Sequence, residues 1–382
     1  MEVKQIYTLV NSALAESVGT SAVVNEDLSN LVDAGNAVFD NNSFDAFSRA
    51  LVDHVGRMVF VDRKYRGFGY SLIMDGWESG AVMQKVASEI PHSTENESYN
   101  LVNGATYDPH EFYGTNVYVK FYNKYVTFEI DKSIAERQLR SAFSGASEMN
   151  GFISMLYNEI DKGFTVALAN LSRRNVNNMI GEVINAAGAN AINLLADYNA
   201  GPNAGGTALT AALALYDVDF LKYASMRILE TSDRLTEIST LFNNGATEKF
   251  TPKDMQKIIM LSAFQRAADT YLQSGTYHNE FTRLPDAEIT SYWQGTGTDY
   301  GFDSISAIDV KTSEGNTVAA DGILGVIFDR DAIGINCMER WVRTQPNAKA
   351  DFVNYFYKMK AQYFNDLNEN CVVFYIADPV TP

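Results

Sequence analysis

The sequence predicts an α+β fold, in which helices and strands occupy largely separate stretches of the chain. Three observations carry this prediction. An uninterrupted helical pattern covers 147–185, a pattern with a period of two covers 116–130, and short strand signals recur from 281 to the end of the chain. The length of 382 residues suits two or three domains.

The stretch 147–185 carries apolar residues three and four positions apart and contains no proline. At about 1.5 Å per residue, such a helix is roughly 57 Å long. Its apolar spacing drifts, so the pattern favours a strut across an elongated subunit over a coiled coil. We expect the apolar stripe to face a sheet formed by 116–130 and a C-terminal hairpin. A bend or early end is expected at Gly151, Gly163 or 175–178.

Residues 64–115 contain too few apolar side chains to bury a core. Their hydrophobic flanks predict a projecting two-stranded arm that partners keep ordered. The strand 116–130 is expected to return from this arm, because its apolar phase slips near Asn123–Lys124. The candidates for contact with a neighbouring subunit are Trp77, Val82, Met83, Lys85, Val86, Ile90, Tyr99, Leu101, Tyr107, Phe112 and Tyr113.

The N-terminal residues 1–63 read as an arm with small helices at 3–16 and 44–59 and no core of its own. Further helices are expected at 217–243 and 252–274. In the second, Thr251 and Pro252 have the character of a cap and a first helical position.

The last part of the chain reads as strands. Short strands are expected within 281–334, between turns that contain Gly and Asp. A terminal hairpin is expected from strands near 352–364 and 371–376, joined by the turn at 365–370.

The net charge of −17 argues against a protein that grips nucleic acid, because duplex binding neutralises phosphates. It is compatible with a wall that surrounds DNA without holding it. The 21 Tyr and 22 Phe residues suit cores and also subunit interfaces. Cys337 and Cys371 read as buried free thiols rather than a disulfide. The sequence shows no secretory signal and no membrane-spanning run, which predicts folding in a cytosol.

The sequence predicts no cofactor, no metal site and no conventional catalytic site. The four His residues are not spaced as metal ligands. Gly201 and Gly206 have the spacing of a phosphate loop, but Thr207 replaces the required Lys. The segment 329–334 has the start of a calcium loop but lacks its later ligands. An enzyme with an atypical site remains an alternative.

The order of these parts resembles the major capsid proteins of tailed double-stranded DNA bacteriophages, which have the Hong Kong 97-type fold. The local sequence is also similar in WESGAVMQKVASEIP at 77–91, in YVTFEIDKSIAERQLRSAF at 125–143 and in YFNDLNENCVVFYI at 363–376. The smaller short-tailed phages are the nearest relatives by this resemblance. A bacterial encapsulin-like compartment, which shares the fold, is the alternative.

The resemblance implies that the protein is structural and that its domains have the following roles. It assigns 1–63 to an N-terminal arm, 64–115 to an extended loop, 116–189 to a peripheral domain with spine helix 147–185, 190–345 to an axial domain, and 346–382 to a return into the peripheral domain.

The resemblance also implies hexamers and pentamers of an icosahedral shell, with portal, scaffolding and head-completion proteins as partners and DNA enclosed with weak contact. The expected location is the virion, after assembly in the host cytoplasm. No covalent cross-link through Lys85 is expected, since no matching Asn or Glu is found. A scaffold, if used, is expected to be encoded elsewhere.

Overall fold

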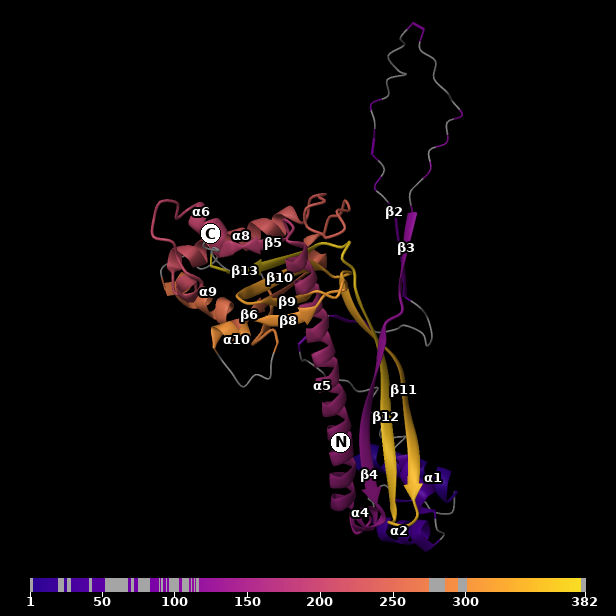
Figure 1. Ribbon diagram of the computed structural model, residues 1–382. Coiled ribbons are helices and arrows are strands. Elements are labelled where there is room, and N and C mark those ends of the chain that lie inside the picture. The colour runs from indigo at the N-terminus through magenta and orange to yellow at the C-terminus, as the bar shows by residue number, and fades with distance from the viewer. Residues whose placement is uncertain are drawn as a thin grey trace. The chain divides into compact units, whose positions relative to one another are not determined.

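The computed structural model describes residues 3–19, 24–25, 29–40, 43–51, 68–69, 72–74, 83–88, 90, 92–93, 95, 103–104, 110, 112, 114, 117–274, 286–294 and 301–378 (Figure 1). The chain divides into two compact units. Unit 1 contains Met1–Ser79, Tyr125–Arg174 and Ile335–Gln362, and unit 2 contains Gly80–Lys124, Asn175–Gly334 and Tyr363–Pro382.

Unit 1 begins with small helices, of which two lie at the predicted positions and one, at Leu31–Asp40, lies where the sequence predicts none. They are α1 (Val3–Ser17), α2 (Leu31–Asp40) and a helical segment at 44–51; the rest of the helix expected at 44–59 lies outside the described residues. The rings of Phe39 and Phe47 lie 6.0 and 5.2 Å from that of Phe143, which follows helix α4 (Glu136–Ala142). These helices therefore share the core of unit 1.

The sheet of unit 1 has the strand order β1-β11-β12-β4. Its members are β1 (Ile73–Met74), β11 (Ile333–Asn347), β12 (Phe352–Asn365) and β4 (Tyr125–Ala135). Strands β4 and β12 pair antiparallel from Phe352 opposite Ala135 to Gln362 opposite Tyr125. One face of β12 is buried, and the other carries cross-strand polar pairs such as Lys358 with Glu129.

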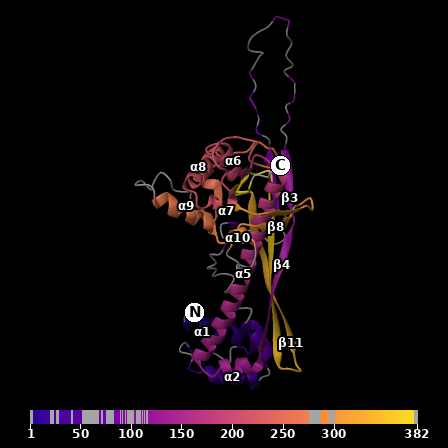
Figure 2. The ribbon, with the colours of Figure 1, turned by 60° about the vertical axis from the view of Figure 1, so that its left-hand side comes forward.

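Helix α5 (Ala146–Ala186) is one continuous helix of 41 residues, which confirms the prediction for 147–185. It continues through Gly151, Gly163 and 175–178, where a bend or end was expected. Gly163 lies against Ile130 of β4: a Cβ atom there would lie 2.6 Å from Ile130 Cδ1, so glycine permits the close approach. Figures 1 and 2 show α5 beside β4, as the apolar stripe predicts. The helix ends where Ala187 adopts a φ of 48°.

The strand expected at 116–130 is two strands in two sheets. Strand β3 (Val117–Tyr122) ends at Asn123–Lys124, where the apolar phase slips, and β4 begins at Tyr125. The phase slip was therefore a correct signal of a change in environment. The short helix α4 that follows begins at Glu136, because β4 continues to Ala135.

The predicted terminal hairpin is wrong. Strand β12 lies in the sheet of unit 1, whereas β13 (Cys371–Tyr375) lies in a different, five-stranded sheet. The residues of β13 from Cys371 to Phe374 are buried whichever way they point, which is the environment of a central strand covered on both faces. The helical stripe of α5 therefore faces β4 and its partners rather than a hairpin.

The five-stranded sheet is the core of unit 2. Its order is β5 (Ala191–Asn193), β13, β10 (Ile323–Asp329), β6 (Gln256–Leu261) and β7 (Glu288–Thr290). Helices α6 (Leu194–Ala200), α8 (Val218–Arg234) and α9 (Ser262–Ser274) contribute buried side chains to one cluster with this sheet. Smaller elements are α7 (Ala211–Ala214), α10 (Phe302–Ile305), β8 (Ile308–Lys311) and β9 (Thr317–Ala320).

Two predicted helices differ from the structure. The stretch 252–274 contains a 3-10 turn at Lys253–Met255, then β6, and only then α9. The apolar run from Ile258 to Leu261 pairs with two neighbouring strands in the buried sheet, and this pairing overrides the helix-start signals at Thr251 and Pro252. The helix expected at 217–243 ends at Arg234.

Neither Cys371, which is buried, nor Cys337, which is half-buried, forms a disulfide. Among the helices that the structure describes, none is long and apolar enough to cross a membrane.

Candidate assembly site at the β2–β3 ribbon

Strands β2 (Met83–Ser88) and β3 form an antiparallel two-stranded ribbon in unit 2, with Lys85 opposite Lys120 and Val86 opposite Val119. Side chains alternate across a strand, so the ribbon has two faces of different chemistry. An isolated two-stranded ribbon is only marginally stable in water, so other contacts must support it.

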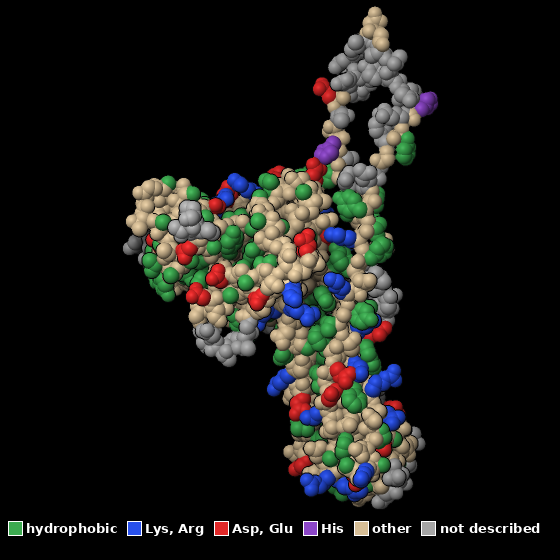
Figure 3. Space-filling model, viewed as in Figure 1, with side chains coloured by type: hydrophobic (Ala, Val, Ile, Leu, Met, Phe, Trp, Pro, Cys, Tyr) green, Lys and Arg blue, Asp and Glu red, His purple; other side chains and the backbone are tan. Residues whose placement is uncertain are grey.

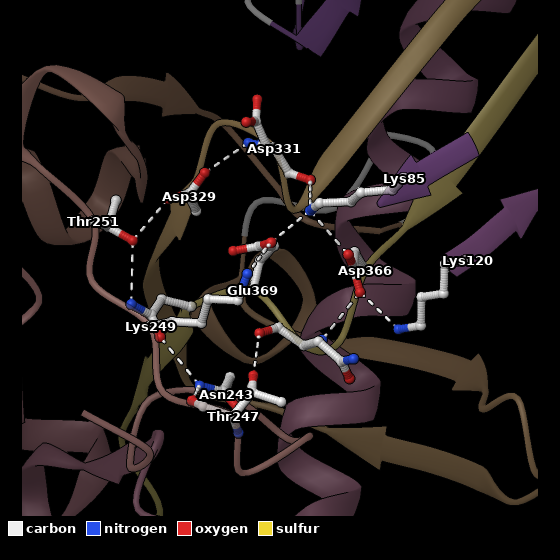
Figure 4. A network of polar contacts seen from close by, with 12 residues as sticks. Lys85, Lys120, Asn243, Thr247, Lys249, Thr251, Asp329, Asp331, Asp366 and Glu369 are labelled. Carbon is white, nitrogen blue, oxygen red and sulfur yellow. Dashed lines mark hydrogen bonds and ion pairs between the residues drawn. The ribbon is translucent and has the colours of Figure 1, made fainter. Parts of the chain in front are cut away.

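One face of the ribbon is held by ion pairs (Figure 4). Lys85 Nζ lies 2.9 Å from Asp366 Oδ2 and 2.6 Å from Glu369 Oε1. Lys120 Nζ lies 2.7 Å from Asp366 Oδ1, and Lys249 Nζ lies 3.0 Å from Glu369 Oε1. Three lysines therefore surround two carboxylates of the segment between β12 and β13, and two of these lysines belong to the ribbon.

The carboxylate of Asp366 offsets the repulsion between two lysines of the ribbon. Like charges directly opposite each other on a ribbon are destabilising, and Lys85 and Lys120 are such a pair. The Asp366 side chain is only 3% exposed. Burial raises its pKa, but the hydrogen bonds and charges of Lys120 and Lys85 outweigh burial and bring the pKa to about 2.

The same environment acts on the neighbouring groups. Burial lowers the pKa of Lys85, but Glu369 and Asp366 outweigh this effect and raise the pKa above its ordinary value. Burial and the negative charge of Asp366 raise the pKa of Tyr122, which lies on the same face as the two lysines. Asp366, Lys85 and Tyr122 thus keep their ordinary charge states near neutral pH.

The carboxylates are fixed by backbone contacts of their own segment. Asp366 N donates to Ala332 O at 2.7 Å, and Asp366 Oδ1 accepts from Asn368 N at 3.1 Å. Glu369 N donates to Asp366 O at 3.2 Å. Because the acceptors are held in place before the ribbon docks, the lysines lose less entropy on pairing than they would with mobile partners.

The opposite face of the ribbon is apolar and exposed. Val86, Val117, Val119 and Phe121 are each between 42% and 64% exposed. By the strand register these side chains share one face. Figure 3 shows hydrophobic side chains along the paired strands. Such a contiguous exposed apolar patch is typical of an interaction surface.

The structure places the predicted interface residues in different environments. Val86 and Phe112 are exposed, Ile90 is half-buried, and Lys85 is bound within its own chain. Met83 lies in β2, and its side chain is not among those described. The residues outside the described part of the chain are Trp77, Val82, Tyr99, Leu101, Tyr107 and Tyr113.

Sequence reasoning missed part of the site. The alternation at 117–121 indicated a strand face but not that this face stays exposed. Nothing in the local pattern points from Lys85 and Lys120 to Asp366 and Glu369, which are distant in sequence.

The described residues contain no group of three or more His, Cys, Asp or Glu side chains that could hold a metal ion. At the 329–334 segment, the Asp329 carboxylate accepts from Thr251 Oγ1 at 2.8 Å and from Asp331 N at 2.8 Å. Burial raises the pKa of Asp329. The site therefore offers ion pairs and apolar area, which are suited to docking.

Fold and site together define the class of structural, assembly-forming proteins. A family model described as Phi29-like phage major capsid protein matches residues 8–375, and the chain belongs to this family. Its helices and sheets are of the α+β class that the sequence predicts. The protein is therefore a major capsid protein that forms a multimeric virion shell, and the encapsulin-like alternative has no support.

Solved structures of phage capsids are similar to this chain. The capsid structure of Staphylococcus phage Andhra is 11% identical, with a TM-score of 0.49, and the match covers 83% of this chain and 86% of that one. The capsid structure of cyanophage P-SCSP1u is 12% identical, with a TM-score of 0.46, and the match covers 83% and 90%. No curated protein matches the sequence.

Proposed function

We propose that this capsid protein forms the pentamers and hexamers of an icosahedral shell around packaged double-stranded DNA, and that the β2–β3 ribbon docks on a neighbouring copy. One observation carries the proposal: the two faces of the ribbon differ. The lysine face is tied to its own chain through Asp366 and Glu369, while the apolar face, with Phe121, stays exposed. Apolar area left exposed on a supported ribbon is available for a partner.

We assign the parts of the chain as the capsid resemblance implies. Residues 1–63 are the N-terminal arm, and 64–115 are the extended loop that includes β2. Residues 116–189 with α5 as spine helix form the peripheral domain, joined by β12 of the segment 346–382, and 190–345 form the axial domain. Strand β13, which also lies within 346–382, pairs with β10 and therefore belongs with the axial domain. The candidate contact residues of the loop, among them Val86 and Phe112, lie at the interface between copies.

The partners and the absence of catalysis belong to the same proposal. Portal, scaffolding and head-completion proteins associate with the shell, which assembles in the host cytoplasm. The net charge of −17 keeps contact with the enclosed DNA weak. The proposed role is structural and involves no catalysis, and the polar cluster around Asp366 serves to hold the ribbon through ion pairs within the chain.

Negative-stain microscopy of the purified protein tests the proposal. We expect uniform closed shells, or rings of five and six subunits. A chain that stays monomeric under all assembly conditions would contradict it.

A deletion tests the loop. Removing 75–113 is expected to leave a folded subunit that does not assemble, but this deletion also removes Lys85 and its ion pairs. A sharper variant replaces 89–116 by Asn-Gly, which joins the paired residues Ser88 and Val117 in a hairpin turn. We expect this variant to fold and to lose assembly. Regular shells from it would show that the loop beyond the ribbon is not required.

A further inference from the structure

The segment 236–250 of unit 2 forms a loop, which we call the finger. Ser239 and Lys249 exchange both backbone hydrogen bonds, at 3.0 and 3.1 Å, and close it as an antiparallel bridge. This bridge places Ile238 opposite Phe250 on one face. Ile238, Leu241 and Phe250 are 52% to 58% exposed. Three large apolar side chains are therefore displayed on one short loop.

The finger is held rigidly. Asn243 clamps its turn: its Nδ2 donates to Thr247 O at 2.8 Å and its Oδ1 accepts from Thr247 N at 2.9 Å. Asn244 N and Gly245 N both donate to Leu367 O, at 3.0 and 3.2 Å. Ala246 has a φ of 48°, a left-handed conformation that alanine adopts only where its surroundings impose it. A preorganised loop loses little entropy when it binds.

The finger and the ribbon share one anchor. Lys249 of the finger pairs with Glu369, the carboxylate that also binds Lys85 of the ribbon. Past the end of β2, His92 Nε2 lies 3.1 Å from Glu248 Oε2 of the finger. The ribbon and the finger are therefore both held by the same 366–370 segment.

The exposed residues of the finger from Ile238 to Phe250 are uncharged, and the one exposed charged residue of the finger is Glu237 at its start, although unit 2 is strongly acidic. Unit 2 has 28 Asp and Glu residues against 13 Lys and Arg. The exposed finger residues in this span are Ile238, Thr240, Leu241, Gly245, Ala246 and Phe250. The charged members, Glu248 and Lys249, are paired within the chain.

These observations indicate what binds the finger. Two acidic copies repel each other wherever their charged surfaces meet, and they approach with least repulsion through an apolar patch that carries little charge. A basic partner would instead be drawn to the acidic surface around it. We infer that the finger is a second contact between copies of this chain, in which Ile238, Leu241 and Phe250 bury their apolar area on a neighbouring subunit. This inference rests on the proposed shell function.

The test compares Phe250→Glu and Ile238→Glu with the matched control Met226→Glu. Met226 lies on α8 of the same unit and is also 52% exposed, but it is outside the finger. We expect both finger variants to reduce the yield of closed shells at least tenfold, because a charge is then buried at the contact, while the control assembles normally. Circular dichroism and thermal melting of the unassembled subunits establish that the variants fold. If Phe250→Glu does not fold, Phe250→Ser, which adds no charge, replaces it in the test. We expect Phe250→Ser to reduce the yield of closed shells about threefold.

The other outcomes overturn the inference. Normal shell yield from folded Phe250→Glu, or from Phe250→Ser in its place, shows that the finger is not a contact between copies. Normal shells from the purified variant, combined with loss of infectious phage, show that the finger binds a different partner. If the wild-type chain forms no shells, the proposed function itself fails. If the finger variants assemble as well as the wild type, the inference about the finger is wrong, but the proposed function is unaffected.

Discussion

The two faces of the β2–β3 ribbon differ in chemistry, because one face is charged and the other is apolar. On one face, Lys85 and Lys120 meet the buried carboxylate of Asp366 at 2.9 and 2.7 Å. On the other, Val119 and Phe121 remain exposed and have no ion pairs to make. Because successive residues of a strand point to opposite sides, one short ribbon presents a lysine face that pairs within the chain and an apolar face that stays exposed.

The comparison shows where each kind of interaction is useful. Ion pairs between fixed groups hold a marginal ribbon in one place without hiding its apolar residues. In the proposed assembly, apolar area provides the attraction between copies, since the net charge of −17 opposes their association. The largest effects of substitution are therefore expected at the carboxylate that binds the lysine face and at the large side chains of the apolar face.

Removing the shared carboxylate should have the largest effect on the lysine face. Asp366→Asn leaves Lys85 and Lys120 opposite each other without a negative partner. We expect the free energy of unfolding of the unassembled subunit to fall by about 3 kcal/mol, as when a buried ion pair loses one partner. Denaturant titration measures this loss, and hydrogen exchange of the β2 and β3 amides should rise. The matched control Glu129→Gln, on an exposed cross-strand pair of unit 1, should change stability little.

Charging the apolar face should separate assembly from folding. Phe121→Glu adds a charge to an exposed position, so the free energy of unfolding should change by no more than about 0.5 kcal/mol. The yield of shells should fall at least tenfold, because the charge would be buried against the neighbouring copy. Val166→Glu, at an equally exposed position on α5, is the control. Normal assembly of Phe121→Glu would refute the role of this face.

Acid should weaken the lysine face more gradually. The pKa of Asp366 is about 2, below its ordinary value of 3.8, so its contribution to stability is present above pH 3.8 and is lost as pH falls toward 2. The free-energy difference between wild type and Asp366→Asn should shrink by roughly 2 kcal/mol over this range. The raised pKa of Lys85 acts in the other direction: its contribution is present below 10.5 and is lost as pH rises through the higher folded value. If the difference in the free energy of unfolding between wild type and Asp366→Asn stays constant between about pH 4 and pH 2, the Asp366 carboxylate does not form the stabilising ion pairs with Lys85 and Lys120.

Parts of the fold follow from local pattern. Helix α5 was predictable because its apolar spacing fits the helical period over 41 residues without proline. The change of environment at Asn123–Lys124 was also readable, because a slip of the two-residue period moves side chains to the other face. The helix-start signals at Thr251 and Pro252 misled, since the buried sheet turned Gln256–Leu261 into a strand.

The sequence by itself determined the long helix, the ribbon's alternation and the acidic balance, because periodicity and charge are local properties of the chain. It could not assign β12 and β13 to separate sheets, nor bring Lys85 and Lys120 to Asp366. Only the tertiary structure decided these, because such contacts depend on which distant segments pack together and leave no local period. The capsid ribbon is therefore readable as a strand from sequence, but its two-faced chemistry appears only once its partners are in place.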